Sequence, residues 1–71
     1  MLTTKAIFLV CMMTPNGQPD PDTCEPFATG SAERSMEFCQ SVLPELVARL
    51  EERLVDGAAV VIARCIEERS G

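Results

Sequence analysis

Four cysteines are the residues of this chain with the most reactive chemistry. Between Cys11, Cys24, Cys39 and Cys65 lie 12, 14 and 25 residues, so there is no Cys-x-x-Cys pair of the kind that redox enzymes use. Four thiolates can hold zinc, but structural zinc sites usually take their ligands as close pairs. An even number of cysteines in so short a chain is more typical of disulfides. Thiol redox chemistry and zinc binding are therefore remote alternatives.

The other side chains that could act in catalysis do not form a recognisable constellation. The chain has no histidine, so the most common proton-transfer group in enzymes is missing. Its glutamates read as solvated charges, and its serines and threonines fall in expected caps and turns. We therefore expect a non-catalytic protein with no catalytic, metal-binding or cofactor-binding residues and no cofactor.

The composition limits both the size of the core and the class of partner. With 71 residues the chain can form one domain, residues 1–71, whose core is aliphatic because it has three Phe and neither Trp nor Tyr. Eleven acidic residues against six basic ones give a net charge of −5. This balance argues against binding to nucleic acid or to an anionic membrane, because both need clustered Lys or Arg. A domain of this size also needs support from disulfides, a metal or a partner.

The pattern of apolar and turn-forming residues predicts an α+β fold in the order β-β-α-β, with a two- or three-stranded sheet. The expected elements are a strand at 5–13, a Pro/Gly-rich loop at 14–23, a short edge strand at 24–29, a helix at 31–55, a strand at 58–66 and a frayed tail at 67–71. The apolar run of the first strand is too short to cross a bilayer and lacks the features of a secretory signal.

The predicted helix is amphipathic and packs on one face of the sheet. Its apolar positions recur at steps of three and four residues and are Met36, Cys39, Leu43, Leu46 or Val47, Leu50 and Leu54. Gly30 and Ser31 offer an N-cap, and Gly57 offers a stop. Pro44 lacks the amide that an inner helical position donates, so we expect a kink or a break near residues 41–44.

The predicted topology selects one of the three possible cysteine pairings. Cys11 ends the first strand and Cys24 begins the second, so both lie at one end of a hairpin. Cys39 in the first part of the helix and Cys65 near the end of the last strand lie at the opposite end. We therefore expect Cys11–Cys24 and Cys39–Cys65 as disulfides, or as neighbouring free thiols if the chain resides in a reducing cytosol.

Both faces of the two long strands are apolar, although a strand with one wet face should alternate apolar with polar residues. A single helix covers one face only, so the other is expected to pack against a second copy or another protein. The predicted interface residues are Phe8, Val10, Met12, Val60, Ile62 and Ile66. Coverage by the loop and the tail is the alternative.

The cysteine contexts carry a resemblance. Leu-Val-Cys11, Asp-Thr-Cys24-Glu, Cys39 in the helix and Ala-Arg-Cys65 resemble a group of small uncharacterised bacterial and phage proteins, found particularly among alphaproteobacteria. These share the pattern strand-Cys, loop-Cys, helix-Cys, strand-Arg-Cys. The resemblance implies a bacterial or phage genomic setting and no particular activity.

Taken together, the sequence predicts a protein-interaction module that assembles through an apolar sheet face, and a phage- or prophage-encoded accessory or inhibitor protein is one candidate for it. A structural component of a larger assembly, such as a phage virion stapled by disulfides, is the alternative. We expect a protein partner or self-association, in the cytoplasm or in a virion.

Overall fold

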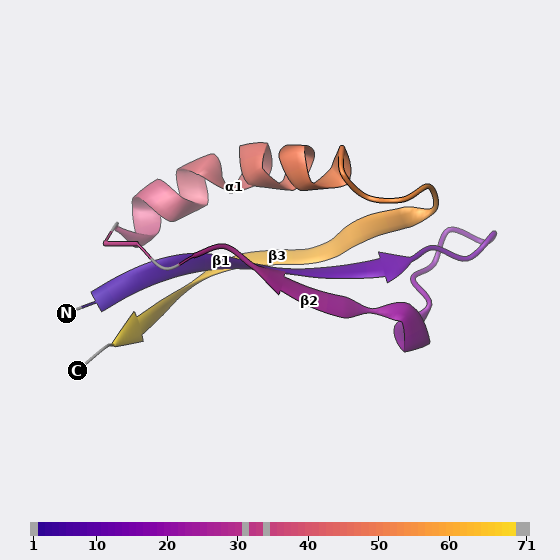
Figure 1. Cartoon of the computed structure of the whole chain (residues 1–71), viewed down its shortest axis with the longest axis horizontal. Coiled ribbons are helices and arrows are strands. Elements are labelled where there is room, and N and C mark those ends of the chain that lie inside the picture. The colour runs from indigo at the N-terminus through magenta and orange to yellow at the C-terminus, as the bar shows by residue number, and fades with distance from the viewer. Residues whose placement is uncertain (1, 31, 34, 70–71) are drawn as a thin grey trace.

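A computed structural model describes residues 2–30, 32–33 and 35–69 of the chain. It contains β1 (Leu2–Met12), a 3-10 turn η1 (Pro21–Thr23), β2 (Glu25–Ala28), α1 (Met36–Glu51) and β3 (Ala58–Arg69). The three strands form one antiparallel sheet in the order β2-β1-β3. The helix lies over this sheet (Figure 1). The predicted α+β fold with the order β-β-α-β is confirmed.

β1 is the central strand because its apolar run can be buried between two neighbours. It pairs with β2 through four residues, Ile7 to Val10, and with β3 along its whole length. Burial alternates along it: Thr4, Ala6, Phe8 and Val10 are buried, and the residues between them are half-buried. The alternation shows that one face of the sheet is better covered than the other.

The connection from β1 to β2 is fixed by turn chemistry and by a disulfide. Gly17 has a φ of 80°, a conformation that glycine adopts without steric cost. The Thr23 hydroxyl accepts a hydrogen bond of 2.8 Å from the amide of Met12, and Cys11 is bonded to Cys24. β2 itself is short and exposed. Pro26 is compatible with it because β2 is an edge strand.

α1 differs from the predicted helix at both ends. Its N-cap is Ser35, whose hydroxyl accepts a bond of 3.1 Å from the amide of Phe38, and its last residue is Glu51. The helix therefore starts five residues later than predicted. Ser31, which the sequence offered as the cap, lies outside the described residues. Of the predicted kink or break, the break is wrong, because α1 continues through the exposed Pro44 as one element (Figure 1); the kink stays a prediction.

β3 is longer than predicted and contains a bulge. Residues 67–69, expected as part of a frayed tail, pair with Thr4, Thr3 and Leu2 at the start of β1. The register shifts where Leu9 lies opposite Ile62 and Val10 lies opposite Val60. Val61 therefore has no partner on β1, which is the arrangement of a β-bulge.

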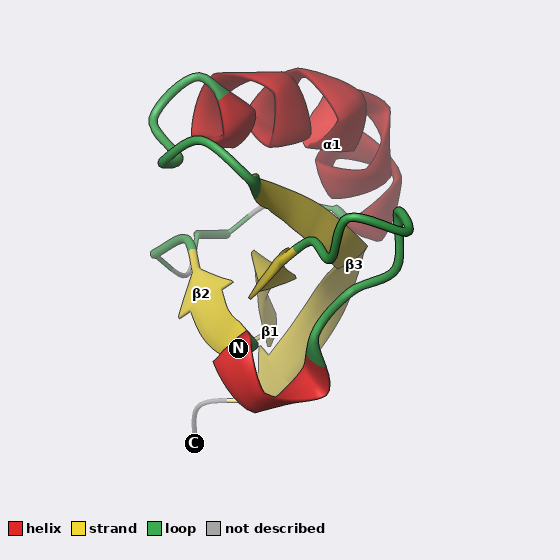
Figure 2. Ribbon diagram, turned by 90° about the vertical axis from the view of Figure 1, so that its right-hand side faces the viewer, coloured by secondary structure: helices red, strands yellow, loops and turns green. Residues whose placement is uncertain are grey.

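The core lies between α1 and one face of the sheet. Ala6, Phe8 and Cys39 are its buried centre, and the half-buried residues packed against them are Leu43, Leu46, Val47, Leu50, Val60, Ala63 and Cys65. The Cys39–Cys65 disulfide ties the helix to β3. Seen from the end, α1 covers a single face of the sheet (Figure 2).

Candidate functional site

The sheet face opposite α1, here called the open face, carries a row of apolar side chains from each strand. Ile7 and Leu9 of β1 point away from the buried row of Phe8 and Val10, because successive strand residues face opposite sides. Their neighbours across the strands share their side of the sheet, and these are Ala28, Pro26, Arg64 and Ile62. Ile62 is 44% exposed. In the described part of the chain, no helix covers this face.

The bulge in β3 enlarges the open face. Val60 and Ala63 both pack towards α1, so the two residues between them must both point the other way. Val61 is 42% exposed, close to the value of Ile62. The bulge thus turns two adjacent large apolar side chains towards solvent, where a regular strand would turn only one.

The open face is hollowed into a groove of about 530 Å³. Ile7, Leu9, Pro26, Ala28 and Ile62 line it, and Arg64 lies among them. Lys5 and Glu68 form an ion pair further along the same face. Among the described strand residues, the charged groups on this face are thus two cations and one anion, although the whole chain has a net charge of −5.

Four of the six predicted interface residues lie on the other side of the sheet. Phe8 and Val10 are each only 6% exposed under α1, Val60 packs against the same core, and Met12 continues their row at the end of β1. The prediction is wrong for Phe8, Val10 and Val60, which pack under α1; Met12 is 38% exposed and stays a predicted interface residue. Alternation identifies two apolar rows on β1 but does not say which of them the helix covers. In a regular strand Val60 and Ile62 would share a face, but the bulge at Val61 places them on opposite faces.

Ile62 and Ile66 are the two predicted interface residues that belong to the open face. The prediction missed Ile7, Leu9 and Val61, which share this face. The sequence signal for Ile7 and Leu9 was present, because they form one of the two apolar rows of β1. The exposure of Val61 follows from the bulge, and no feature of the sequence marked it.

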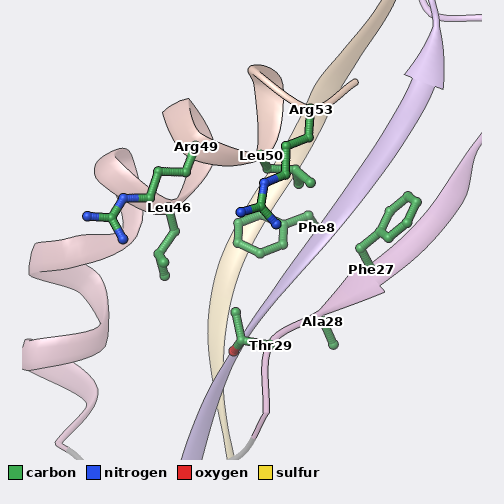
Figure 3. Close-up of a pocket in the computed structure, with 8 residues that line it drawn as sticks. All are labelled: Phe8, Phe27, Ala28, Thr29, Leu46, Arg49, Leu50 and Arg53. Atoms are coloured by element: carbon green, nitrogen blue, oxygen red, sulfur yellow. The ribbon is translucent and has the colours of Figure 1, made fainter. Parts of the chain in front are cut away.

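A second, smaller groove lies on the helix side, where α1 leaves β2 uncovered. It measures about 290 Å³, with Phe8 of β1, Phe27 of β2 and Leu46 and Leu50 of α1 as its apolar lining (Figure 3). Arg53 extends from the end of α1 over Phe8, whereas the side chain of Arg49 is turned back along the helix and bonds Glu45 at 3.2 Å. Sequence reasoning did not find this groove. Its one signal is the four-residue spacing of the two arginines on the helix.

All four cysteines are in disulfides, Cys11–Cys24 and Cys39–Cys65, which is the pairing that the topology predicted. This oxidised form leaves no thiol for redox chemistry or for zinc. Within residues 2–30, 32–33 and 35–69, no three potential ligand residues gather in a metal-binding group. The described part of the chain also holds no helix long and apolar enough to cross a membrane.

Among the described charged groups, Lys5 pairs with Glu68, Arg49 pairs with Glu45, and Asp20 caps the 3-10 turn η1. In the described residues every buried side-chain nitrogen or oxygen has a hydrogen-bond partner. The geometry thus offers apolar surface rather than a set of convergent reactive groups. Comparison of the chain with protein-family models, with curated proteins and with solved structures finds no match.

Proposed function

We propose that this chain is a non-catalytic protein-interaction module that docks its open face against an apolar surface of another protein. One observation carries the proposal: in the described part of the chain no helix or further strand covers the face opposite α1, which presents the half-buried Ile7, Leu9 and Ile66 and the exposed Val61 and Ile62. Monomeric proteins rarely leave a contiguous apolar surface of this kind without a partner.

The size of the open face suits a modest interface. β1 has 11 residues and is about 37 Å long, and β1 and β3 together are about 10 Å wide. The four residues of β2 add a strip about 14 Å long, so the face measures roughly 400 Å². A docked partner would bury a similar area, which gives a total of about 800 Å², below the range of stable complexes, so we expect a weak, reversible complex.

The absence of a reactive constellation supports the non-catalytic part of the proposal. The chain has no histidine, and its cysteines are occupied in disulfides. Catalysis by a protein needs a nucleophile with a base, an acid–base pair or a metal. The ion pairs that the structure shows, Lys5–Glu68 and Glu45–Arg49, are each a cation with a carboxylate at the surface. Such pairs fit structural or solubility roles better than proton transfer.

A structural role in a larger assembly, such as a phage virion, is a second candidate that the disulfides favour. One bond fixes the β1–β2 connection and the other fixes α1 on β3. This is the support that a small domain needs outside a reducing compartment. The two candidates differ in solution: a virion component should polymerise or precipitate alone, whereas an interaction module should remain soluble as a monomer or small oligomer.

The proposal is tested by placing a charge on the open face. Immobilised wild-type protein, Ile62→Glu and Val55→Glu are each exposed to lysate of the source cells, and the retained proteins are quantified by mass spectrometry. Val55 is 69% exposed and lines a hollow on the helix side, so it is a matched control. We expect at least one protein to be retained by the wild type and Val55→Glu and lost with Ile62→Glu. Identical retention by all three would contradict the proposal.

A further inference from the structure

The outer edge of β3 is long and has no partner strand in the described part of the chain. The sheet order β2-β1-β3 places β3 at an edge, and it has 12 residues without a proline. The opposite edge is different, because β2 has four residues and includes Pro26. Long edges with free backbone groups are the places where a second chain can add to a sheet, whereas short edges with proline resist this.

The hydrogen bonds of β1 show which backbone groups of β3 point outward. Thr4 exchanges backbone bonds with Ala32, and the carbonyl of Ala6 accepts from the amide of Thr29, so Thr4 and Ala6 face the β2 side. Lys5 and Ile7 therefore face β3, where they lie opposite Ile66 and Arg64. It follows that the N–H and C=O groups that point away from β1 belong to Ala63, Cys65, Glu67 and Arg69.

The pleat of the sheet restricts how a second β3 could pair with this edge. Residues opposite each other in an antiparallel pair point to the same face. Arg64, Ile66 and Glu68 point to the open face and must therefore meet residues of the same set. The outward backbone groups lead to the same restriction. They allow Cys65 to exchange hydrogen bonds with Glu67 of the second copy, and Ala63 to do so with Arg69 of the second copy.

Charge selects one register among those that the pleat allows. If Ile66 lies opposite the second copy's Ile66, Arg64 lies opposite Glu68 at both ends of the pair. These are non-hydrogen-bonded positions, where opposite Cα atoms are only about 4.5 Å apart. In a register centred on Arg64, the Arg64 side chains of the two copies would lie opposite each other. In a register centred on Cys65, Arg64 of one copy would lie opposite Ile66 of the other. The register centred on Ile66 is therefore the one with complementary charge.

We propose that the chain forms a homodimer in which β3 pairs antiparallel with β3 of a second copy, with Ile66 at the two-fold axis. The result is a continuous six-stranded sheet. Glu68 already bonds Lys5 within its own chain, so each end of the interface carries a Lys5–Glu68–Arg64 network across three strands. This dimer uses the edge of the sheet and does not depend on the docking of a partner on the open face.

α1 begins beside the proposed two-fold axis. The disulfide places Cys39, in the first turn of the helix, against Cys65 beside the two-fold axis. The rest of α1 runs towards the start of β3, because Leu50 lines a hollow together with Val10 and Ala58. The two helices therefore extend away from the axis in opposite directions. The two open faces then lie side by side in one surface of about twice the area, roughly 800 Å², with the charged network along its middle.

Sedimentation equilibrium of the purified oxidised protein tests the proposal. We expect a monomer–dimer equilibrium that Arg64→Glu or Glu68→Arg weakens about tenfold, because each variant places two like-charge pairs in the interface. The double variant with both changes should bind at least about threefold more tightly than either single variant, although the new arginine at position 68 then lies beside Lys5. Arg49→Glu on α1 is the matched control, since it makes the same charge change on an exposed side chain far from the edge.

Glu67→Pro provides a second test that does not rely on charge. The amide of Glu67 points outward, so proline removes a bond of the dimer and keeps the ladder with β1. We expect this variant to be folded and monomeric. A wild type that is monomeric at millimolar concentration would overturn the proposal, as would a double charge variant that stays as weak as the single ones. The measurement needs no cellular partner, so its failure would leave the capture experiment with Ile62→Glu unaffected.

Discussion

At the scale of single residues, Phe8 and Ile62 illustrate the difference between the two faces of the sheet. Phe8 is 6% exposed and lies in the core under α1, whereas Ile62 is 44% exposed on the open face. We predict that Phe8→Ala lowers the free energy of unfolding by about 3 kcal/mol, because it removes a buried ring and leaves a cavity. Ile62→Ala should lower it by about 1 kcal/mol or less.

Urea unfolding of both variants, with the disulfides intact, measures this difference. Equal losses of stability would mean that Ile62 is as well covered as Phe8, contrary to an open face. The same comparison shows where sequence reasoning fails. Phe8 and Ile62 were predicted to share one interface, and only the packing of α1 on one row of β1 separates them.

The cysteines are the residues whose arrangement the sequence predicted best. Their pairing follows from the order of the elements, because the hairpin and the crossing of α1 determine which ends of the sheet they reach. We predict that replacing Cys11 and Cys24 by Ala lowers the free energy of unfolding by about 3 kcal/mol, and that replacing Cys39 and Cys65 lowers it by about 3.5 kcal/mol. The second pair closes the longer loop, with a sequence separation of 26 against 13.

Thermal unfolding of the two double variants and of the reduced wild type checks this prediction. Because 1 kcal/mol corresponds to about 4–8 °C in a domain of this size, losses of more than 10 °C are expected. A reduced protein that melts at the same temperature as the oxidised one would show that the disulfides do not stabilise the fold.

At the scale of elements, Pro44 is an unfavourable residue inside α1. It removes one intrahelical hydrogen bond, and its side chain is exposed, so the sheet gains no packing from it. We predict that Pro44→Ala raises the free energy of unfolding by about 1–3 kcal/mol and increases the helical signal in circular dichroism. Glu45→Ala, at the next position, should change stability by less than about 0.5 kcal/mol because its ion pair with Arg49 is exposed. A Pro44→Ala variant no more stable than Glu45→Ala would contradict this prediction.

β3 offers a comparison between two adjacent backbone amides. The amide of Glu68 points towards β1, where Glu68 lies opposite Thr3, whereas that of Glu67 points outward. We predict that Glu68→Pro lowers the free energy of unfolding by about 1–3 kcal/mol through the loss of a ladder bond, and that Glu67→Pro lowers it by less. Chemical denaturation at a concentration low enough to keep the protein monomeric measures both. Equal losses would show that the two amides do not alternate as described.

The sequence predicted the order of the three strands and the helix; it missed the 3-10 turn η1 and erred at the element boundaries. The charged residues 67–69 resemble a tail when read alone, but their partners at the start of β1 extend the ladder. Ser35 caps α1 because the preceding chain, at Ala32, is still bonded to Thr4 beside β1. Both boundaries depend on contacts between residues distant in sequence, which local propensity does not encode.

At the scale of the whole molecule, the fold consists of one sheet and one helical layer, with overall extents of 44 × 22 × 16 Å. The imbalance between two apolar sheet faces and one helix is visible in the sequence and is present in the structure (Figure 2). The identity of the bare face was not predictable. It depends on the side from which the chain crosses the sheet after β2, and both apolar rows of β1 would accept the helix.

The most direct test of the proposed function is site-specific photo-crosslinking in the source cells. A benzophenone amino acid is introduced in place of Ile62 on the open face and, as the control, in place of the exposed Ala48 on α1. After irradiation, we expect an adduct of higher mass with another protein from position 62 and none from position 48. Absence of any adduct at position 62, or the same adducts from both positions, would contradict the claim that this chain works by docking its bare sheet face.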